Sequence, residues 1–319
     1  MYKAYFHLTR SPFDLTPDPT CFVPTVRHNE TLAALYYGVR RHKGLVVVTG
    51  EVGTGKTLLL RCLLKLLEDS HDIAYAYMFN NRLTSYEFLQ YIAMDFGLPA
   101  AGKNKSELLF SLSEFLISRA AKQLSTVLIV DEAHQMSDEL LEEVRLLSNL
   151  ETYDDKLLQI VMVGQPELDS KLDSVGLRQL KQRISLRTYL TPLSYEETAR
   201  YIEQRLQLAG GGEEAATLFP QKAVESVFRY SRGFPRLINT ICENSLITAY
   251  AHQLQTVPQD VIEEVAREFR LDSAPFSEGG RLDLIGQDYH RANGTHLTVE
   301  SREGRAGADA SRVVDRAKR

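Results

Sequence analysis

Short apolar runs and longer periodic stretches alternate along the first two thirds of the chain. Such runs, bounded by glycine or polar residues, are typical of buried parallel strands, and they occur at 44–50, 72–79, 125–134 and 157–164, with a fifth strand expected at 184–193. Amphipathic periodicity predicts helices at 28–42, 56–70, 84–97, 105–124 and 137–151. Strands that alternate with helices predict an α/β domain with a mainly parallel sheet.

After Pro192 the periodicity becomes purely helical. We expect helices at 194–210, 220–232, 235–253 and 258–270, and therefore a small all-α domain over residues 193–271. Residues 44–192 then form the α/β domain. Residues 1–43 form an N-terminal segment, in which four prolines between residues 11 and 25 exclude a regular helix there. Residues 272–319 lack sustained periodicity, so we interpret them as a largely disordered tail that could end in a short helix at 310–319.

The amino-acid composition indicates a soluble globular protein and says little more about its function. The 319 residues are 44% hydrophobic and 25% charged, and the net charge of −5 does not favour a general polyanion binder, although a local basic patch is compatible with it. Three widely spaced cysteines form no CxxC pair, which argues against a zinc site or a disulfide framework. We expect no signal peptide, no transmembrane segment and a cytoplasmic location, with any membrane attachment made through partners.

The first chemical signal is the stretch GEVGTGKT, residues Gly50–Thr57, between an expected strand and an expected helix. It fits the G-x-x-x-x-G-K-[ST] pattern, whose glycines let backbone N–H groups surround phosphates. Lys56 is expected to reach the β and γ phosphates of ATP, and the Thr57 hydroxyl to bind Mg²⁺. The predicted nucleotide-binding residues here are Gly50, Glu51, Val52, Gly53, Thr54, Gly55, Lys56, Thr57 and Leu58.

A second signal, VLIVDEAH, ends an apolar strand with two acids. Asp131 is expected to hold the Mg²⁺ shell, and Glu132 to polarise the attacking water as a carboxylate base. The alternative is a buried strand that ends in a capping aspartate. The letters DEAH also occur in superfamily-two helicases, but those proteins need a second α/β lobe, and here only helices follow.

Two further polar residues follow expected strands. Gln165, after the fourth strand, could orient the attacking water, although Gly-Gln-Pro is also an ordinary turn sequence. Asn80, after the second strand, could hydrogen-bond Glu132 and gate it, or be a turn asparagine. Both are included among the candidate catalytic residues.

Arginines supply the last candidates. Arg178, Lys181, Arg183 and Arg187 precede or lie within the fifth strand. They could provide an arginine finger to a neighbouring subunit's γ-phosphate, contact nucleic acid, or form a solvated face; Arg183 and Arg178 are the best finger candidates. Arg236 follows a proline at the first turn of an expected helix and could fold over the nucleotide, the alternative being a surface arginine.

Together these motifs resemble the AAA+ ATPases: Gly50–Thr57, Val127–His134, Val163–Gln165 and Gly233–Arg236. The opening YFHLTRSPFDLTPDP, followed by HNETLAALYYGV, resembles the ExeA/GspA type of secretion ATPase, which is related to the TnsC/TniB transposition ATPases. The likeness covers about residues 1–270. It implies an α/β P-loop NTPase fold with a mainly parallel five-stranded sheet in the order 5-1-4-3-2 and a small all-α lid domain.

The same resemblance implies that Phe13 and His28 lie near the adenine and that ATP sits between protomers of a ring or filament. ExeA-like proteins continue into a transmembrane helix and a peptidoglycan-binding domain, and the last 48 residues here show neither. The favoured hypothesis is an ATP hydrolase, with Mg²⁺, that assembles or remodels a protein partner of a secretion or envelope system. The alternatives are an ATP-dependent DNA-binding filament of transposition and a nucleotide-binding module without turnover.

Overall fold

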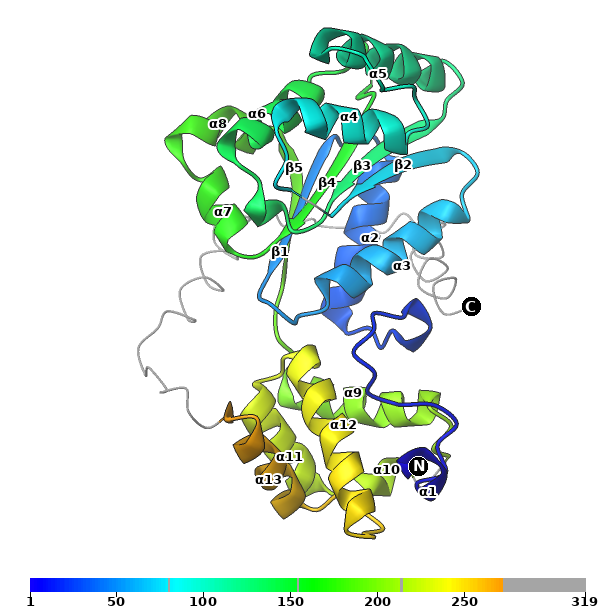
Figure 1. The fold of residues 1–319 in the computed structure, drawn as a ribbon, viewed down its shortest axis with the longest axis vertical. Helices are drawn as coiled ribbons and strands as arrows, with labels where there is room; N and C mark the ends of the chain where they lie inside the picture. Colours follow the sequence, from blue (N-terminus) through cyan, green and yellow to red (C-terminus); the bar gives the residue numbers. More distant parts are fainter. Residues whose placement is uncertain (80, 154, 213–214, 272–319) are drawn as a thin grey trace, which may run out of the picture.

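A computed structural model describes residues 1–79, 81–153, 155–212 and 215–271 (Figure 1). Five parallel strands form one sheet in the order β2-β3-β4-β1-β5, which is the predicted order counted from the other edge. The strands are β1 (Leu45–Gly50), β2 (Ile73–Met78), β3 (Ser125–Val130), β4 (Gln159–Gly164) and β5 (Ile184–Leu190). Because all five run in one direction, the residues that follow β1, β3 and β4 meet at one edge of the sheet.

Helices cover both faces of this sheet. In the α/β part they are α2 (Val26–Arg40), α3 (Lys56–Glu68), α4 (Ser85–Asp95), α5 (Lys105–Ala120), α6 (Asp138–Leu147), α7 (Glu167–Leu172) and α8 (Arg178–Lys181), with the 3-10 turns η2 (Ala133–Gln135) and η3 (Val175–Leu177). Side chains of the internal strand β1 alternate between the faces. Val46 and Val48 pack with α2 and α3, whereas Leu45 and Val47 join the cluster that contains α4 to α8. Both faces of β1 are therefore buried, which explains its continuous apolar sequence.

A separate helical body lies beyond the carboxyl edge of the sheet (Figure 1). Its helices are α1 (Tyr2–Tyr5), α9 (Tyr195–Leu208), α10 (Ala215–Leu218), α11 (Gln221–Ser231), α12 (Pro235–Ala251) and α13 (Gln259–Glu268). Apolar side chains of α9, α11, α12 and α13 form its core. The predicted α/β fold with a small all-α lid is confirmed. The short helices α1, α7, α8 and α10 were not predicted, since four to six residues are too few to show a helical period.

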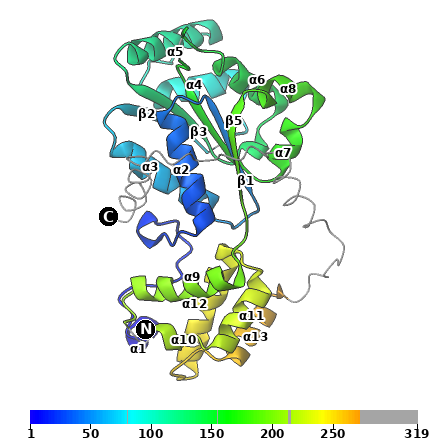
Figure 2. The same cartoon turned by 180° about the vertical axis from the view of Figure 1, so that it is seen from behind.

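The N-terminal segment joins the two bodies. Phe6, Leu8, Phe13 and Val23 pack in the lid core, whereas Phe22 packs against the sheet-side cluster of α2 and α3. We call residues 6–23 the strap; it contains the 3-10 turn η1 (Pro19–Cys21) and passes from the lid to the start of α2 (Figure 2). The sequence indicated one N-terminal unit over residues 1–43, and the structure divides its side chains between two cores. Within the described ranges, none of the helices combines the length and apolar character needed to cross a membrane.

Candidate active site

The loop between β1 and α3 has a shape that depends on glycine. Gly53 and Gly55 have φ values of +86° and +95°, in the left-handed region that other residues rarely adopt. Lys56 is buried, and its Nζ donates to the carbonyls of Gly50 at 2.7 Å and Glu51 at 2.9 Å. The positive N-terminal end of the 13-residue helix α3 opens onto this loop. The loop therefore combines backbone donors, a helix end and a buried cation, which suit a phosphate chain.

Opposite charges face each other across the site. Burial lowers the pKa of Lys56, and the nearby carboxylates of Glu132 and Asp131 oppose that shift. Burial raises the pKa of Asp131, while hydrogen bonds from the Glu132 amide and the Tyr77 hydroxyl oppose it. Thr57, the second residue of α3, follows Lys56 and is half-buried. A hydroxyl and a carboxylate of this kind form a donor set that suits Mg²⁺, and the lysine suits its phosphates.

Asp131 is held at three of its oxygens. Its Oδ1 accepts from the Glu132 N–H at 2.8 Å, and its Oδ2 accepts from the Tyr77 hydroxyl at 3.0 Å. Its main-chain carbonyl accepts from Nδ2 of Asn81, a residue that is only 2% exposed. The peptide bond between the two acids is therefore fixed at its carbonyl by Asn81 and at its N–H by Asp131. This arrangement holds the backbone from which the second acid projects.

Glu132 occupies a strained conformation, with φ +52° and ψ +35°. A non-glycine residue in this region costs about 1–3 kcal/mol and is common at functional sites. Its Oε2 is enclosed yet has no hydrogen-bond partner among the described residues, and the Nδ1 atom of His134 lies 3.3 Å away. A buried carboxylate oxygen without a donor is an acceptor suited to a bound water.

Gln165 and His134 connect the strand ends. The Gln165 N–H points at Nδ1 of His134, at 3.4 Å, so that this nitrogen faces both Gln165 and Glu132. Lys171 of α7 donates to the carbonyls of His134 and Met136, each at 2.7 Å. These contacts tie the turn after β3 to the residues after β4. The half-buried Gln165 thus lies at the same edge of the sheet as Glu132.

The lid touches the phosphate loop directly. The N–H of Arg236, at the start of α12, donates to the Gly53 carbonyl at 3.3 Å, and a Cβ on Gly53 would lie 3.1 Å from that of Arg236. Gly233, with φ +76°, leaves room for the carbonyl of Leu193, which would be 2.0 Å from an added Cβ. The exposed Arg236 side chain therefore starts next to the loop that the glycines shape.

His28 of α2 reaches the loop from the other side. Its Nε2 lies 3.0 Å from the Thr54 carbonyl, and its Nδ1 lies 2.8 Å from the Thr25 hydroxyl. A carbonyl can only accept, so Nε2 carries the proton and Nδ1 accepts from Thr25. Burial lowers the pKa of His28 below its usual 6.5, which keeps the ring neutral.

His28 should make the folded protein sensitive to acid. Its pKa is lower in the folded state than in the unfolded chain, so its contribution to stability is complete above pH 6.5 and is lost as the pH falls below that value. The free energy of unfolding, measured with urea at several pH values, should fall there by at most about 1.4 kcal/mol per pH unit from this group. His28→Gln should flatten that part of the profile; an unchanged profile would contradict the assignment.

Comparisons with known proteins agree with this geometry. A family model described as an AAA domain matches residues 39–172, which include the phosphate loop, both acids and Gln165. General secretion pathway protein A of Aeromonas hydrophila is 43% identical over 252 residues, which make up 79% of this chain but 45% of that protein. The chain belongs to the AAA+ ATPases. Within them it is of the general secretion pathway protein A type, although it spans less than half the length of that relative.

Solved structures show the same fold for this AAA+ ATPase. The Aeropyrum pernix ORC2 protein, in its ADPNP-ADP complexes, has a TM-score of 0.60 at 18% identity, with 97% of this chain and 89% of that chain covered. Drosophila ORC bound to DNA has a TM-score of 0.56 at 20% identity, with 96% and 78% covered. At these identities the likeness concerns the fold alone.

The four basic residues before and within β5 of this AAA+ ATPase, which we call the basic strip, differ in exposure and in partners. They are Arg178, Lys181, Arg183 and Arg187. Arg187 forms a half-buried ion pair with Asp169 of α7, and Lys181 pairs with Asp173 at 2.7 Å. Arg183 is half-buried near the Ser148 carbonyl, whereas Arg178 is exposed at the start of α8. Arg183 precedes β5 and so lies at the opposite edge of the sheet from the phosphate loop. An action of Arg178 or Arg183 on a γ-phosphate therefore needs a second protomer.

The surroundings of Phe13 do not support a place beside the adenine. Its side chain is 0% exposed and packs edge-on against Phe219 of the lid, with ring centroids 5.9 Å apart. The strap directs this side chain into the lid core, so no face of the enclosed ring is open to adenine.

Among the remaining predicted residues of the phosphate loop, Glu51 and Val52 are exposed, and Leu58 is partly buried against the sheet-side cluster. Asn80 lies outside the described residues.

Three residues of the site were missed from the sequence: Tyr77, Asn81 and His134. Tyr77 and Asn81 contact an acid that is at least 50 positions away in the chain, and no local pattern announces such contacts. His134 stands within the DEAH letters and could have been noticed there as a titratable neighbour of Glu132.

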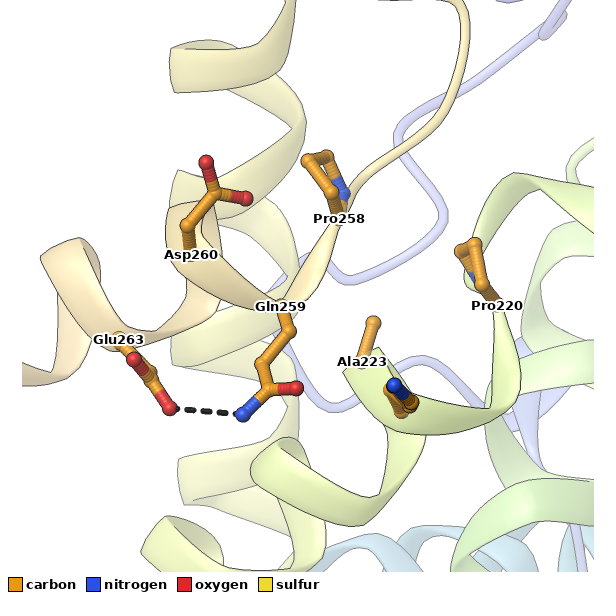
Figure 3. Close-up of a pocket in the computed structure, with 7 residues that line it drawn as sticks. Pro220, Ala223, Pro258, Gln259, Asp260 and Glu263 are labelled. Carbon is orange, nitrogen blue, oxygen red and sulfur yellow. Dashed lines mark hydrogen bonds between the residues drawn. The ribbon is translucent and has the colours of Figure 1, made fainter.

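A hollow on the lid is a poor alternative site for ATP. It lies where α11 and α13 begin and is lined by Pro220, Lys222, Ala223, Pro258, Gln259, Asp260 and Glu263 (Figure 3). Gln259 donates to Glu263 at 2.9 Å across one side of it. Its two acids would repel phosphates, and one lysine does not outweigh them.

Proposed function

We propose that this chain binds ATP with Mg²⁺, hydrolyses it, and uses the cycle to assemble or remodel a protein partner of a secretion or envelope-biogenesis system. The observation that carries the hydrolytic part is Glu132, held in a strained conformation beside Asp131, with an enclosed Oε2 to which no described residue donates a hydrogen bond. A module that only binds nucleotide has no need for this second acid. The 43% identity to general secretion pathway protein A supports the setting.

Each residue has a distinct task in this proposal. Lys56 and the backbone of the loop bind the phosphates, while Thr57 and Asp131 would hold Mg²⁺, which supplies neutralisation of the charge on the transferred phosphate. Glu132 accepts a proton from water. Gln165 orients that water, and Arg236 senses the phosphate from the lid. Hydrolysis then changes the angle between the lid and the sheet.

We further propose that the active site is completed by a neighbouring protomer. Arg178 is the better finger candidate, because it is exposed, whereas Arg183 is half-buried. Arg178→Ala should keep ATP affinity but lower turnover by at least about 100-fold. Lys181→Ala, on the same helix, is the matched control and should keep activity. Turnover per protomer in the wild type should rise with protein concentration.

A mixing experiment separates this role from misfolding. Arg178→Ala protomers retain the acids, and Glu132→Gln protomers retain the finger, so mixed assemblies should contain some complete sites. Combining the two inactive variants should restore part of the turnover, measured as released phosphate. Full activity of Arg178→Ala alone would move the role to Arg183 or remove it, and the same pair of assays on Arg183→Ala distinguishes these outcomes.

Duplex DNA binding is the second hypothesis from the sequence, and the contacts of the basic strip weaken its basis. Arg187 and Lys181 are engaged by Asp169 and Asp173, which reduces the positive charge that the strip could offer to phosphates. The test is a mobility shift of duplex DNA with ATP, repeated over a range of salt concentrations. A salt-dependent shift would favour DNA; its absence at low salt would exclude it.

A further inference from the structure

Tyr77 is a residue of the edge strand β2 whose side chain reaches the acid at the end of β3. In the parallel register it pairs with Ile129, and its ring is half-buried on the α2 and α3 face of the sheet. Its hydroxyl donates to Oδ2 of Asp131 at 3.0 Å. None of the phosphate-loop or acid motifs in the sequence includes this tyrosine.

The backbone of Tyr77 is anchored from outside the sheet. Since β2 is an edge strand, outward-facing N–H and carbonyl groups have no neighbouring strand to pair with. Two side chains of α4 satisfy them at Tyr77: its N–H donates to Asp95 Oδ2 at 2.7 Å, and its carbonyl accepts from the Tyr91 hydroxyl at 3.0 Å. The strand end that presents the phenol is therefore fixed at two points.

We propose that Tyr77 is a positioning residue that sets the orientation of the Asp131 carboxylate for Mg²⁺, an inference that rests on the proposed function. Oδ1 of Asp131 is held by the Glu132 N–H and Oδ2 by Tyr77, so the plane of the carboxylate cannot turn about its bond to Cβ. Each oxygen keeps a second lone pair for the metal or its bound water. Removing a hydrogen bond to a side chain that ligates a metal typically lowers the affinity for that metal.

The chain offers a matched control two residues away. Tyr75 lies on the same face of β2 and packs against the same cluster. Its hydroxyl, however, donates to Glu68 at 2.7 Å and not to Asp131. Tyr77→Phe and Tyr75→Phe therefore remove the same atom from similar surroundings. Only the first substitution releases the Asp131 carboxylate.

The measurement is the affinity for a fluorescent ATP analogue with Mg²⁺ and with EDTA, together with a Mg²⁺ titration of binding. The ratio of the two affinities measures how much Mg²⁺ strengthens nucleotide binding. An inactive fraction of protein affects both affinities equally and cancels in the ratio. Tyr77→Phe should lower this ratio and raise the Mg²⁺ concentration needed for half-maximal enhancement by about 10-fold, with binding in EDTA unchanged. Tyr75→Phe should behave as the wild type.

A second variant covers the case in which Tyr77→Phe folds poorly. Tyr91→Phe keeps the phenol of Tyr77 and removes one anchor of its backbone, so it should lower the ratio in the same direction by less. A wild-type ratio in both Tyr77→Phe and Tyr91→Phe would overturn the proposal. If wild-type protein binds ATP no better with Mg²⁺ than with EDTA, the proposed function fails instead, and the two failures are distinguished.

Discussion

Replacing Glu132 with glutamine is expected to lower ATP turnover by at least about 100-fold while ATP affinity stays within about twofold of the wild type. Glutamine has nearly the same shape and can keep the strained backbone of this position, but it cannot accept the proton of an attacking water. The substitution alters the carboxylate whose enclosed Oε2 accepts no hydrogen bond from the residues that the structure describes. Turnover is measured as phosphate release from assembled protein, and affinity with a fluorescent ATP analogue.

The control is Glu167→Gln. Glu167 is an exposed residue of α7 that contributes negative charge near Lys56 but lacks the enclosed carboxylate oxygen of Glu132. It should change turnover by less than about threefold, because an exposed charge is screened by solvent. If Glu132→Gln hydrolyses ATP at the wild-type rate, the base has been misassigned. If the wild-type protein shows no single turnover when assembled, the chain is a nucleotide-binding module.

Replacing Arg205 with methionine is expected to release the strap and to lower the free energy of unfolding by about 3–5 kcal/mol. Arg205 of α9 is only 5% exposed. Its guanidinium donates to the strap carbonyls of Pro12 at 2.5 Å, Cys21 at 3.0 Å and Asp14 at 3.3 Å. Methionine fills much of the same volume but donates nothing, so these carbonyls lose their partner.

Urea unfolding measures this loss, and limited proteolysis locates it. Cleavage in Arg205→Met should begin within the strap at residues 6–23. The strap leads into α2 and so to His28, whose ring holds the phosphate loop, and nucleotide affinity should therefore fall as well. Arg200→Met is the matched control: it lies on the same helix but is exposed. Equal stability losses in the two variants would contradict a specific role for Arg205.

The elements that shape the site follow from local sequence. Strands β1, β3 and β4 are buried along their whole length and are largely apolar, because a parallel strand that is covered on both faces has no polar side. These three strands and the edge strand β2 lie within about two residues of the predicted ranges, apart from the DEAH residues counted with the third. The phosphate loop is recognisable because its two left-handed positions require glycine. Asp131 follows directly from its place after such a strand.

Residues that act at a distance were harder to assign. Phe13 belongs to an aromatic, proline-rich stretch, and its sequence does not say which core receives its ring. Arg187 counted as one of four cations in a strip, although Asp169, 18 positions earlier, neutralises it inside the fold. Arg205 is one arginine among several on an amphipathic helix, and only the docking of the strap makes it a buried donor.

The sequence by itself determined the α/β class, the helical lid, the phosphate loop and the order of acids along the chain, because strand, helix and turn preferences act over a few neighbouring residues. Only the tertiary structure decided that Tyr77 and Asn81 hold Asp131, that His134 faces Glu132, and that the strap divides between two cores. Those contacts join residues that are distant in sequence or that project from different elements. They arise when helices and strands dock, a step that leaves no periodic trace in the chain.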